Sequence, residues 1–172
     1  MEKILKLFIS QPMHGLDDDL ILKQRSALKT VVEAYMNSIP GLICDFKIDL
    51  IDQFSIPDPD SFNTTHPTET SQRIYRLGRS IQLLANTDVC VFYGNWKKSK
   101  GCTVELEVAK QYGINFIGQK RLCDFCESDP KYNNELELLW PTRFDKLYEV
   151  VSHLTWGNDD NEENENENNK AR

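Results

Sequence analysis

The sequence predicts an α/β protein in which a parallel sheet lies between two layers of helices. Short apolar runs alternate along the chain with longer segments of helical spacing, and the first apolar run is hydrophobic at nearly every position. The alternation β-α-β-α-β-α-β-α favours parallel strands with crossover helices on both faces. At 172 residues we expect one domain. The predicted class is therefore a single-domain, three-layer α/β/α fold of the flavodoxin-like or Rossmann-like kind.

The first part of the chain supplies two strands and one helix. Residues 4–10 form an apolar run that ends before Pro12, which predicts the first strand. Three aspartates at 17–19 follow, and acidic residues favour the start of a helix. The helix continues through apolar positions at helical spacing, namely Leu28, Val31, Val32 and Tyr35. A proline–glycine pair at 40–41 ends it, and residues 42–50 are the second predicted strand.

A polar segment, a helix and a strand follow. Residues 53–69 are rich in Pro, Asp, Ser and Thr, which is typical of a long loop near the rim of a site. The next helix is predicted from four apolar side chains, Ile74, Leu77, Ile81 and Leu84. Residues 89–93 are predicted as a buried strand, and residues 94–101 as a loop.

The last third of the sequence is less regular. Residues 102–112 are predicted as a helix, and residues 115–118 as a short fourth strand. Residues 119–135 show no clear period. A last helix is expected over residues 143–154, after Pro141 and a capping threonine.

The charge of the chain is acidic and uneven. The net charge is −7, of which residues 157–172 contribute −4. We expect one domain over residues 1–156 and a disordered acidic tail, rich in Asn and Glu, over residues 157–172. Without a broad basic face, a nucleic acid polymer is not an expected partner. No apolar stretch approaches the roughly 18 residues of a membrane span, and no secretory signal is recognised. We therefore expect a cytoplasmic protein with no membrane partner.

The sequence holds five cysteines. An odd number in a chain without a recognised signal favours reduced thiols. Cys123 and Cys126 have the CxxC spacing, which leaves a zinc or redox role as the alternative. Zinc would need two further ligands, and the remaining Cys and His residues are scattered singly. No metal site is predicted.

Ligands of parallel sheets bind beyond the carboxyl ends of the strands, where the strand order reverses. Three segments should meet there, residues 10–16, 49–54 and 94–105. The sequence has neither GxGxxG nor GxxxxGK[ST], so a dinucleotide or Walker-type phosphate cradle is not expected. The third segment leads into a helix N-terminus, which attracts anions. Ser99, with the lysines at 97, 98 and 100, would bind a phosphate there; alternatively, Ser99 or Cys102 only caps the helix and the lysines are solvated.

Glu105 lies in the first turn of the predicted 102–112 helix. The helix dipole favours the ionised form of a carboxyl group at that place. An ionised carboxylate that faces the ligand is suited to nucleophilic attack on an anomeric carbon. The alternative is a glutamate that only satisfies free N–H groups at the helix start.

Three motifs, in order over about residues 4–118, resemble one known superfamily. Residues 8–15 read Phe-Ile-Ser-Gln-Pro-Met-His-Gly, and residues 80–93 form a helix that runs through Asp88 into an apolar strand. Residues 99–113 read Ser-Lys-Gly-Cys-Thr-Val-Glu-Leu-Glu-Val-Ala-Lys-Gln-Tyr-Gly. This pattern resembles the nucleoside 2-deoxyribosyltransferase-like superfamily. That superfamily includes transferases that exchange bases between deoxyribosides and hydrolases that cleave deoxynucleoside 5′-monophosphates.

The resemblance implies a set of roles. Glu105 matches the nucleophile that attacks C1′ of the sugar, and Ser99 matches a serine that binds the 5′-phosphate. Gln11, Pro12 and Met13 would form the wall beside the sugar. Phe8, Ser10 and Gly101 lie in the matching motifs and are expected to take part in substrate binding. The implied activity is cleavage or transfer of an N-glycosidic bond in a nucleoside or its 5′-monophosphate, without a metal or organic cofactor, in a homodimer or larger homo-oligomer.

The sequence departs from the superfamily pattern at Phe8, at Ser80 and at Glu107, which stands at a position often held by glycine. Phe8 stands where many members have a tyrosine. Ser80 stands where well-studied members carry an aspartate that handles the proton of the leaving base. Asp49 or Asp52, after the second strand, would have to act as the general acid instead. The departures leave a second hypothesis, a catalytically weakened nucleotide-binding protein of the same fold.

Overall fold

The computed structural model describes residues 2–41, 44–51 and 68–141. Within these ranges one four-stranded, all-parallel sheet has the strand order β2-β1-β3-β4. Its strands are β1 (Glu2–Ser10), β2 (Asp45–Leu50), β3 (Val89–Phe92) and β4 (Asn115–Gly118). The predicted α/β class with a parallel sheet is therefore confirmed.

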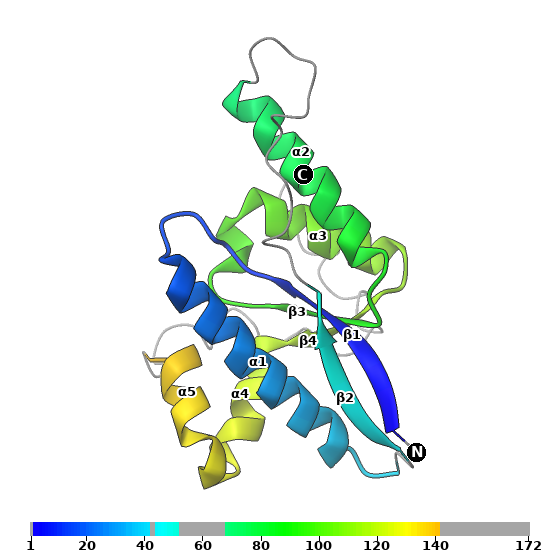
Figure 1. Cartoon of the computed structure of the whole chain (residues 1–172), viewed down its shortest axis with the longest axis vertical. Coiled ribbons are helices and arrows are strands. Elements are labelled where there is room, and N and C mark those ends of the chain that lie inside the picture. The colour runs from blue at the N-terminus through cyan, green and yellow to red at the C-terminus, as the bar shows by residue number, and fades with distance from the viewer. Residues whose placement is uncertain (1, 42–43, 52–67, 142–172) are drawn as a thin grey trace, which may run out of the picture.

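Helices cover both faces of the sheet (Figure 1). On one face lie α1 (Asp18–Ser38), α4 (Gln119–Glu127) and α5 (Asn133–Leu139), which pack against one another. On the other face α2 (Glu69–Leu84) packs against α3 (Lys100–Gln111). Two short 3₁₀ segments, η2 (Trp96–Lys98) and η3 (Pro130–Tyr132), precede α3 and α5.

The side chains of β1 alternate between the two faces, as the period of a strand requires. Leu7 and Ile9 join the core beneath α1, α4 and α5, and Phe8 joins the core beneath α2 and α3. All three are fully buried, which explains why this strand reads as a continuous apolar run. Ser10 ends the strand, and its hydroxyl faces α3. The alternation therefore decides which face receives the last polar side chain.

Polar side chains fix the starts of the three longest helices. Asp17 accepts a hydrogen bond from the N–H of Leu20 (3.1 Å), as its place before the predicted helix suggests. Thr68 caps α2 in the same way. Ser99 caps α3 by accepting from the N–H of Cys102, so α3 begins at Lys100, two residues earlier than the sequence predicts.

The segment that shows no period in the sequence is helical. Residues 119–135 contain α4, η3 and the start of α5. The helices in this segment are short, nine residues in α4 and seven in α5, and Pro130 begins η3 between them, so no apolar spacing continues over many turns. The predicted loop at 53–69 lies mostly outside the described residues. The helix predicted at 143–154 and the acidic tail also lie outside them.

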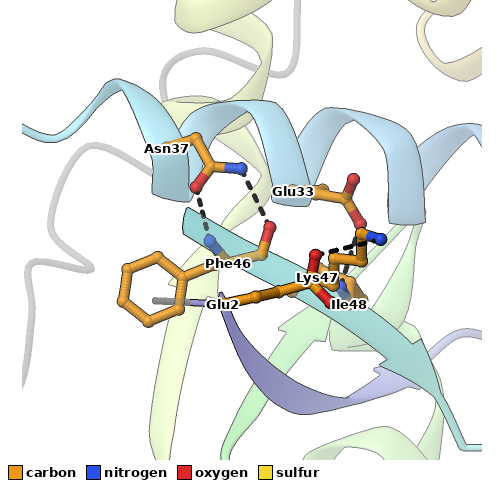
Figure 2. A network of polar contacts seen from close by, with 6 residues as sticks. All are labelled: Glu2, Glu33, Asn37, Phe46, Lys47 and Ile48. Carbon is orange, nitrogen blue, oxygen red and sulfur yellow. Dashed lines mark hydrogen bonds and ion pairs between the residues drawn. The ribbon is translucent and has the colours of Figure 1, made fainter. Parts of the chain in front are cut away.

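Side chains from α1 cover the outer edge of β2 (Figure 2). The amide of Asn37 accepts from the N–H of Phe46 (2.7 Å) and donates to its carbonyl (3.0 Å). Glu33 accepts from the N–H of Ile48 (2.9 Å). Two residues of α1 thus take the place of a neighbouring strand along this edge.

None of the helices in the described ranges is both long enough and apolar enough to cross a membrane. All five cysteines lie in these ranges and are free thiols. Cys123 and Cys126 are fully buried in the core beneath α1. Among the described residues, no group of three or more His, Cys, Asp and Glu side chains is placed to hold a metal ion.

Candidate active site

The carboxyl ends of β1 and β3 lie side by side where the strand order reverses. Ser10 pairs with Phe92 in the parallel register, and the N–H of Tyr93 donates to the carbonyl of Ser10 (2.9 Å). From β1 the chain crosses to β2 on one side, and from β2 it returns past β1 to β3 on the other. The segments after β1 and β3 therefore begin at the point where parallel sheets bind ligands.

Glu105 lies on the buried face of α3, which points to this end of the sheet. Cys102, Glu105 and Ala109 are the buried residues of the helix, at the spacing of one helical face. Because α3 begins at Lys100, Glu105 is its sixth residue and lies beyond the first turn. The expectation that Glu105 belongs to the helix start is therefore wrong. Neither the helix dipole, which acts mainly on the first turn, nor capping of free N–H groups accounts for its place.

Two serine hydroxyls hold the carboxylate of Glu105. Ser10, at the end of β1, donates to Oε2 (2.5 Å), and Ser80, in α2, donates to Oε1. Only 7% of Glu105 is exposed, and both serines are buried. Each carboxylate oxygen therefore receives a hydrogen bond from a different element of the fold, which fixes the orientation of the group.

Burial raises the pKa of Glu105 above its ordinary value. The hydrogen bonds from Ser10 and Ser80 and the positive charge of Arg25 act in the opposite direction, because they favour the ionised form. The sequence predicts a carboxyl group whose charge the helix dipole stabilises. In the structure the charge is stabilised by two hydroxyls and a cation from other elements.

Two thiols lie near this carboxylate. Burial and the negative charge of Glu105 raise the pKa of Cys90 to about 12, and the same two effects raise the pKa of Cys102. Both cysteines are therefore neutral thiols at neutral pH, and a thiol is a poor nucleophile. Glu105 is the group of this cluster that is suited to attack an electrophilic carbon.

The segment that follows β1 combines buried and exposed residues. Ser10 and Gln11 are buried, Pro12 is half-buried and Met13 is exposed. The amide nitrogen of Gln11 donates to Gln24 in α1 (2.7 Å). The side-chain carbonyl oxygen of Gln11 (Oε1) is buried and has no hydrogen-bond partner among the described residues. This orphaned acceptor lies one residue from Ser10, and a buried acceptor without a partner costs free energy unless a ligand supplies a donor.

The segment after β3 supplies the start of α3. Ser99 is half-buried and caps the helix, as the alternative interpretation of this residue expects. Its binding of a phosphate stays a prediction. The three lysines of the segment, Lys97, Lys98 and Lys100, are exposed. A Cβ added at Gly101 would meet only the hydroxyl of Ser99, at 3.8 Å, so neither backbone conformation nor core packing requires glycine there.

The other candidates from the sequence are Phe8, Asp49 and Asp52. Phe8 is fully buried in the core beneath α2 and α3, so no part of its side chain is open to a ligand. Asp49 is exposed in β2 and pairs with Lys6, four residues before Ser10 along β1, or roughly 13 Å at the rise of a strand. Asp52 lies outside the described residues. Neither Phe8 nor Asp49 forms a hydrogen bond with Glu105, whose carboxylate partners in the described part of the chain are Ser10 and Ser80.

Sequence reasoning missed Arg25. This residue of α1 is 2% exposed and acts on Glu105 through its charge. A signal was present, because Arg25 follows Ile21 by four residues and precedes Leu28 by three, which places a cation on the apolar face of the helix.

Comparison of this chain with protein-family models, with curated proteins and with solved structures finds no match.

Proposed function

We propose that this protein cleaves or transfers the N-glycosidic bond of a nucleoside or (deoxy)nucleoside 5′-monophosphate, with Glu105 as the nucleophile. The observation that carries the proposal is the buried carboxylate at the reversal point of the sheet, held by hydroxyls of Ser10 and Ser80. A structural glutamate gains little from such a place, because burying a charge opposes folding. A carboxylate with fixed orientation is suited to attack on a sugar carbon.

The reaction would proceed in two displacements. An oxygen of Glu105 forms a bond to C1′ while the bond between C1′ and the base nitrogen breaks, and the base leaves with the electron pair and takes up a proton. Water then attacks C1′, the ester bond to Glu105 breaks, and the water gives up a proton. Free base, sugar or sugar phosphate and the original carboxylate result. A second base in place of water would give a new nucleoside.

Two further observations support a nucleotide ligand. The superfamily pattern aligns Ser80 with the acid that acts beside the nucleophile, and Ser80 contacts Glu105 directly. The buried carbonyl oxygen of Gln11 lacks a donor among the described residues, and a sugar hydroxyl or an amino group of a base would supply one. Ser99 and the exposed lysines at 97, 98 and 100 are the proposed contacts of a 5′-phosphate.

The test is incubation with a panel of deoxyribonucleosides, ribonucleosides and their 5′-monophosphates, with free base as the measured product. Glu105→Gln is expected to lower the rate by about 10³-fold or more, because it removes the nucleophile. Glu107→Gln, on the exposed side of the same helix, is the matched control and should keep the rate. Base release that survives Glu105→Gln would reject the mechanism. Addition of a second base distinguishes transfer, which yields a new nucleoside, from hydrolysis.

A catalytically weakened nucleotide-binding protein is the second candidate. Ser80 favours it, because a hydroxyl that already donates to Glu105 does not replace a carboxylic acid as the proton donor to a leaving base. Under this function, calorimetry would detect binding of a nucleotide while prolonged incubation releases no base. Ser80→Asp would then be the informative variant, since restored base release would identify Ser80 as the cause of the weakening.

A further inference from the structure

An arginine is buried in α1 at a position where the helix otherwise presents apolar side chains. Arg25 is 2% exposed, so it is buried like its apolar neighbours on the same face, Ile21 and Leu28, which are 1% and 0% exposed. A buried guanidinium is stable only when hydrogen bonds and opposite charge compensate its lost hydration. The surroundings of Arg25 should therefore reveal what it compensates.

The guanidinium of Arg25 contacts both the end of β1 and the segment that follows it. Its Nη2 donates to the carbonyl of Ile9 (3.4 Å) and lies 3.9 Å from the sulfur of Met13. Ile9 directly precedes Ser10, which donates to Glu105. The carbonyl of Leu7, two residues earlier, accepts from the N–H of Ile51 in the ladder to β2. The carbonyls of Leu7 and Ile9 point to the same side of β1, so Arg25 bonds the carbonyl that follows the last bond to the β2 side.

The charge of Arg25 also acts on Glu105. Among the described residues, the groups that act on this carboxylate are Ser10 from β1, Ser80 from α2, Arg25 from α1, Cys90 from β3 and Cys102 from α3. The two hydroxyls are neutral, and burial keeps the two thiols protonated. Arg25 is the cation among these five groups, and its charge opposes the effect of burial on Glu105.

We propose that Arg25 is a positioning residue of the Glu105 site, which holds residues 9–13 against α1 and places a buried positive charge next to Ser10, the residue that donates to the Glu105 carboxylate. The part of Arg25 in catalysis rests on the proposed function, in which Glu105 must be ionised to act as the nucleophile. Its effect on the ionisation of Glu105 is a property of the free protein and is tested without a substrate.

The experiment follows the titration of Glu105 by NMR in protein labelled with ¹³C at the glutamate side-chain carboxyl. The Glu105 signal is the one that disappears in Glu105→Gln. Arg25→Gln, which keeps polar atoms but loses the charge, should raise the titration midpoint by about one pH unit. Arg25→Lys should keep the midpoint close to wild type. Lys23→Gln, an exposed residue on the same helix, is the matched control for the loss of one positive charge and should leave the midpoint unchanged.

A folded Arg25→Gln variant with the wild-type midpoint would overturn the proposal, because a purely structural arginine affects stability and leaves the midpoint in place. If Arg25→Gln does not fold, Arg25→Lys decides, and a midpoint one unit higher despite the retained charge would also overturn it. If base release is found, its acid limb should move with the midpoint in each variant. If none is found, the proposed function fails while the NMR result on Arg25 still stands.

Discussion

Ser80 of α2 donates a hydrogen bond to Oε1 of Glu105 in α3, across 25 positions of the sequence. Ser80 and Leu84 are the buried residues of α2, so the carboxylate provides one of the few buried contacts that dock this helix. The amino-terminal part of α2 carries exposed residues, including Ile74. The docking of α2 and the orientation of Glu105 therefore depend on the same hydrogen bond.

Loss of the Ser80 hydroxyl should make Glu105 harder to ionise. The bond from Ser80 lowers the pKa of Glu105, so Ser80→Ala is expected to raise the titration midpoint of the Glu105 carboxyl by about one pH unit. The measurement is the same ¹³C titration. Ser26→Ala, an exposed serine of α1, is the control and should have no effect. An unchanged midpoint in Ser80→Ala would mean that this bond does not stabilise the carboxylate.

Glu105 should lower the stability of the protein at neutral pH. Because its pKa is raised above the ordinary value of 4.5, the folded protein binds this proton more tightly than the unfolded chain does. That contribution to the free energy of unfolding is complete below pH 4.5 and is lost as the pH rises through the folded pKa. Glu105→Gln, which cannot ionise, should therefore be more stable than wild type at pH 7, by about 1 kcal/mol.

Urea unfolding at pH 7 and at about pH 3.5 checks this expectation, since at the lower pH the protonated glutamic acid resembles the amide and the difference should vanish. Glu107→Gln should stay within about 0.5 kcal/mol of wild type at both pH values. A Glu105→Gln protein less stable than wild type at pH 7 would contradict the argument.

Gly101 offers a test of the phosphate contact. An added Cβ meets only the hydroxyl of Ser99, so Gly101→Ala should fold at least as well as wild type, and alanine favours the helix by roughly 0.5–1 kcal/mol. If a phosphate binds beside Ser99, the methyl group should weaken the affinity for a nucleoside 5′-monophosphate about tenfold, or about 1.4 kcal/mol. The affinity for the unphosphorylated nucleoside should not change.

Calorimetry with both ligands measures this difference, and Gly78→Ala, at an open position in α2, is the control. Equal effects of Gly101→Ala on nucleotide and nucleoside would argue against a phosphate at this helix start.

The edge of β2 depends on the side-chain amide of Asn37. Asn37→Ala removes two hydrogen bonds to the backbone of Phe46, so we expect the free energy of unfolding to fall by about 1–2 kcal/mol. Asn86→Ala, which removes an exposed bond near the end of α2, should cost about 0.5 kcal/mol or less. Urea unfolding compares the two variants. Equal losses would show that the edge contacts of β2 do not stabilise the fold.

Much of the fold is visible in the sequence because local signals agree with it. The aspartates at 17–19, the apolar run before Pro12 and the strand at Val89 each coincide with an element boundary to within a few residues. The predicted start of α3 is two residues too late, because Ser99 and Cys102 are both plausible caps and only the backbone decides between them. Two residues at a helix start change whether Glu105 lies in the first turn or beyond it.

The site is less visible because its contacts are tertiary. Glu105 is 95 positions from Ser10 and 25 from Ser80, and no local pattern links them. The resemblance marks Ser80 as a departure, whereas in the structure it is a partner of Glu105. Arg25 could have been found as a cation among the apolar positions of α1, but its relation to Glu105 depends on how α1 and α3 pack on opposite faces of the sheet.

The alternation along β1 limits how this chain can vary. Ile9 and Ser10 are adjacent, yet one lies in the core beneath α1 and the other reaches Glu105 beneath α3. Insertion or deletion of one residue between Leu7 and Ser10 would exchange the two faces of the strand. An apolar side chain would then face the Glu105 carboxylate, and a hydroxyl would be buried in the apolar core beneath α1. A substitution in β1 alters the packing on one face of the sheet, whereas a change in the length of β1 alters both faces at once.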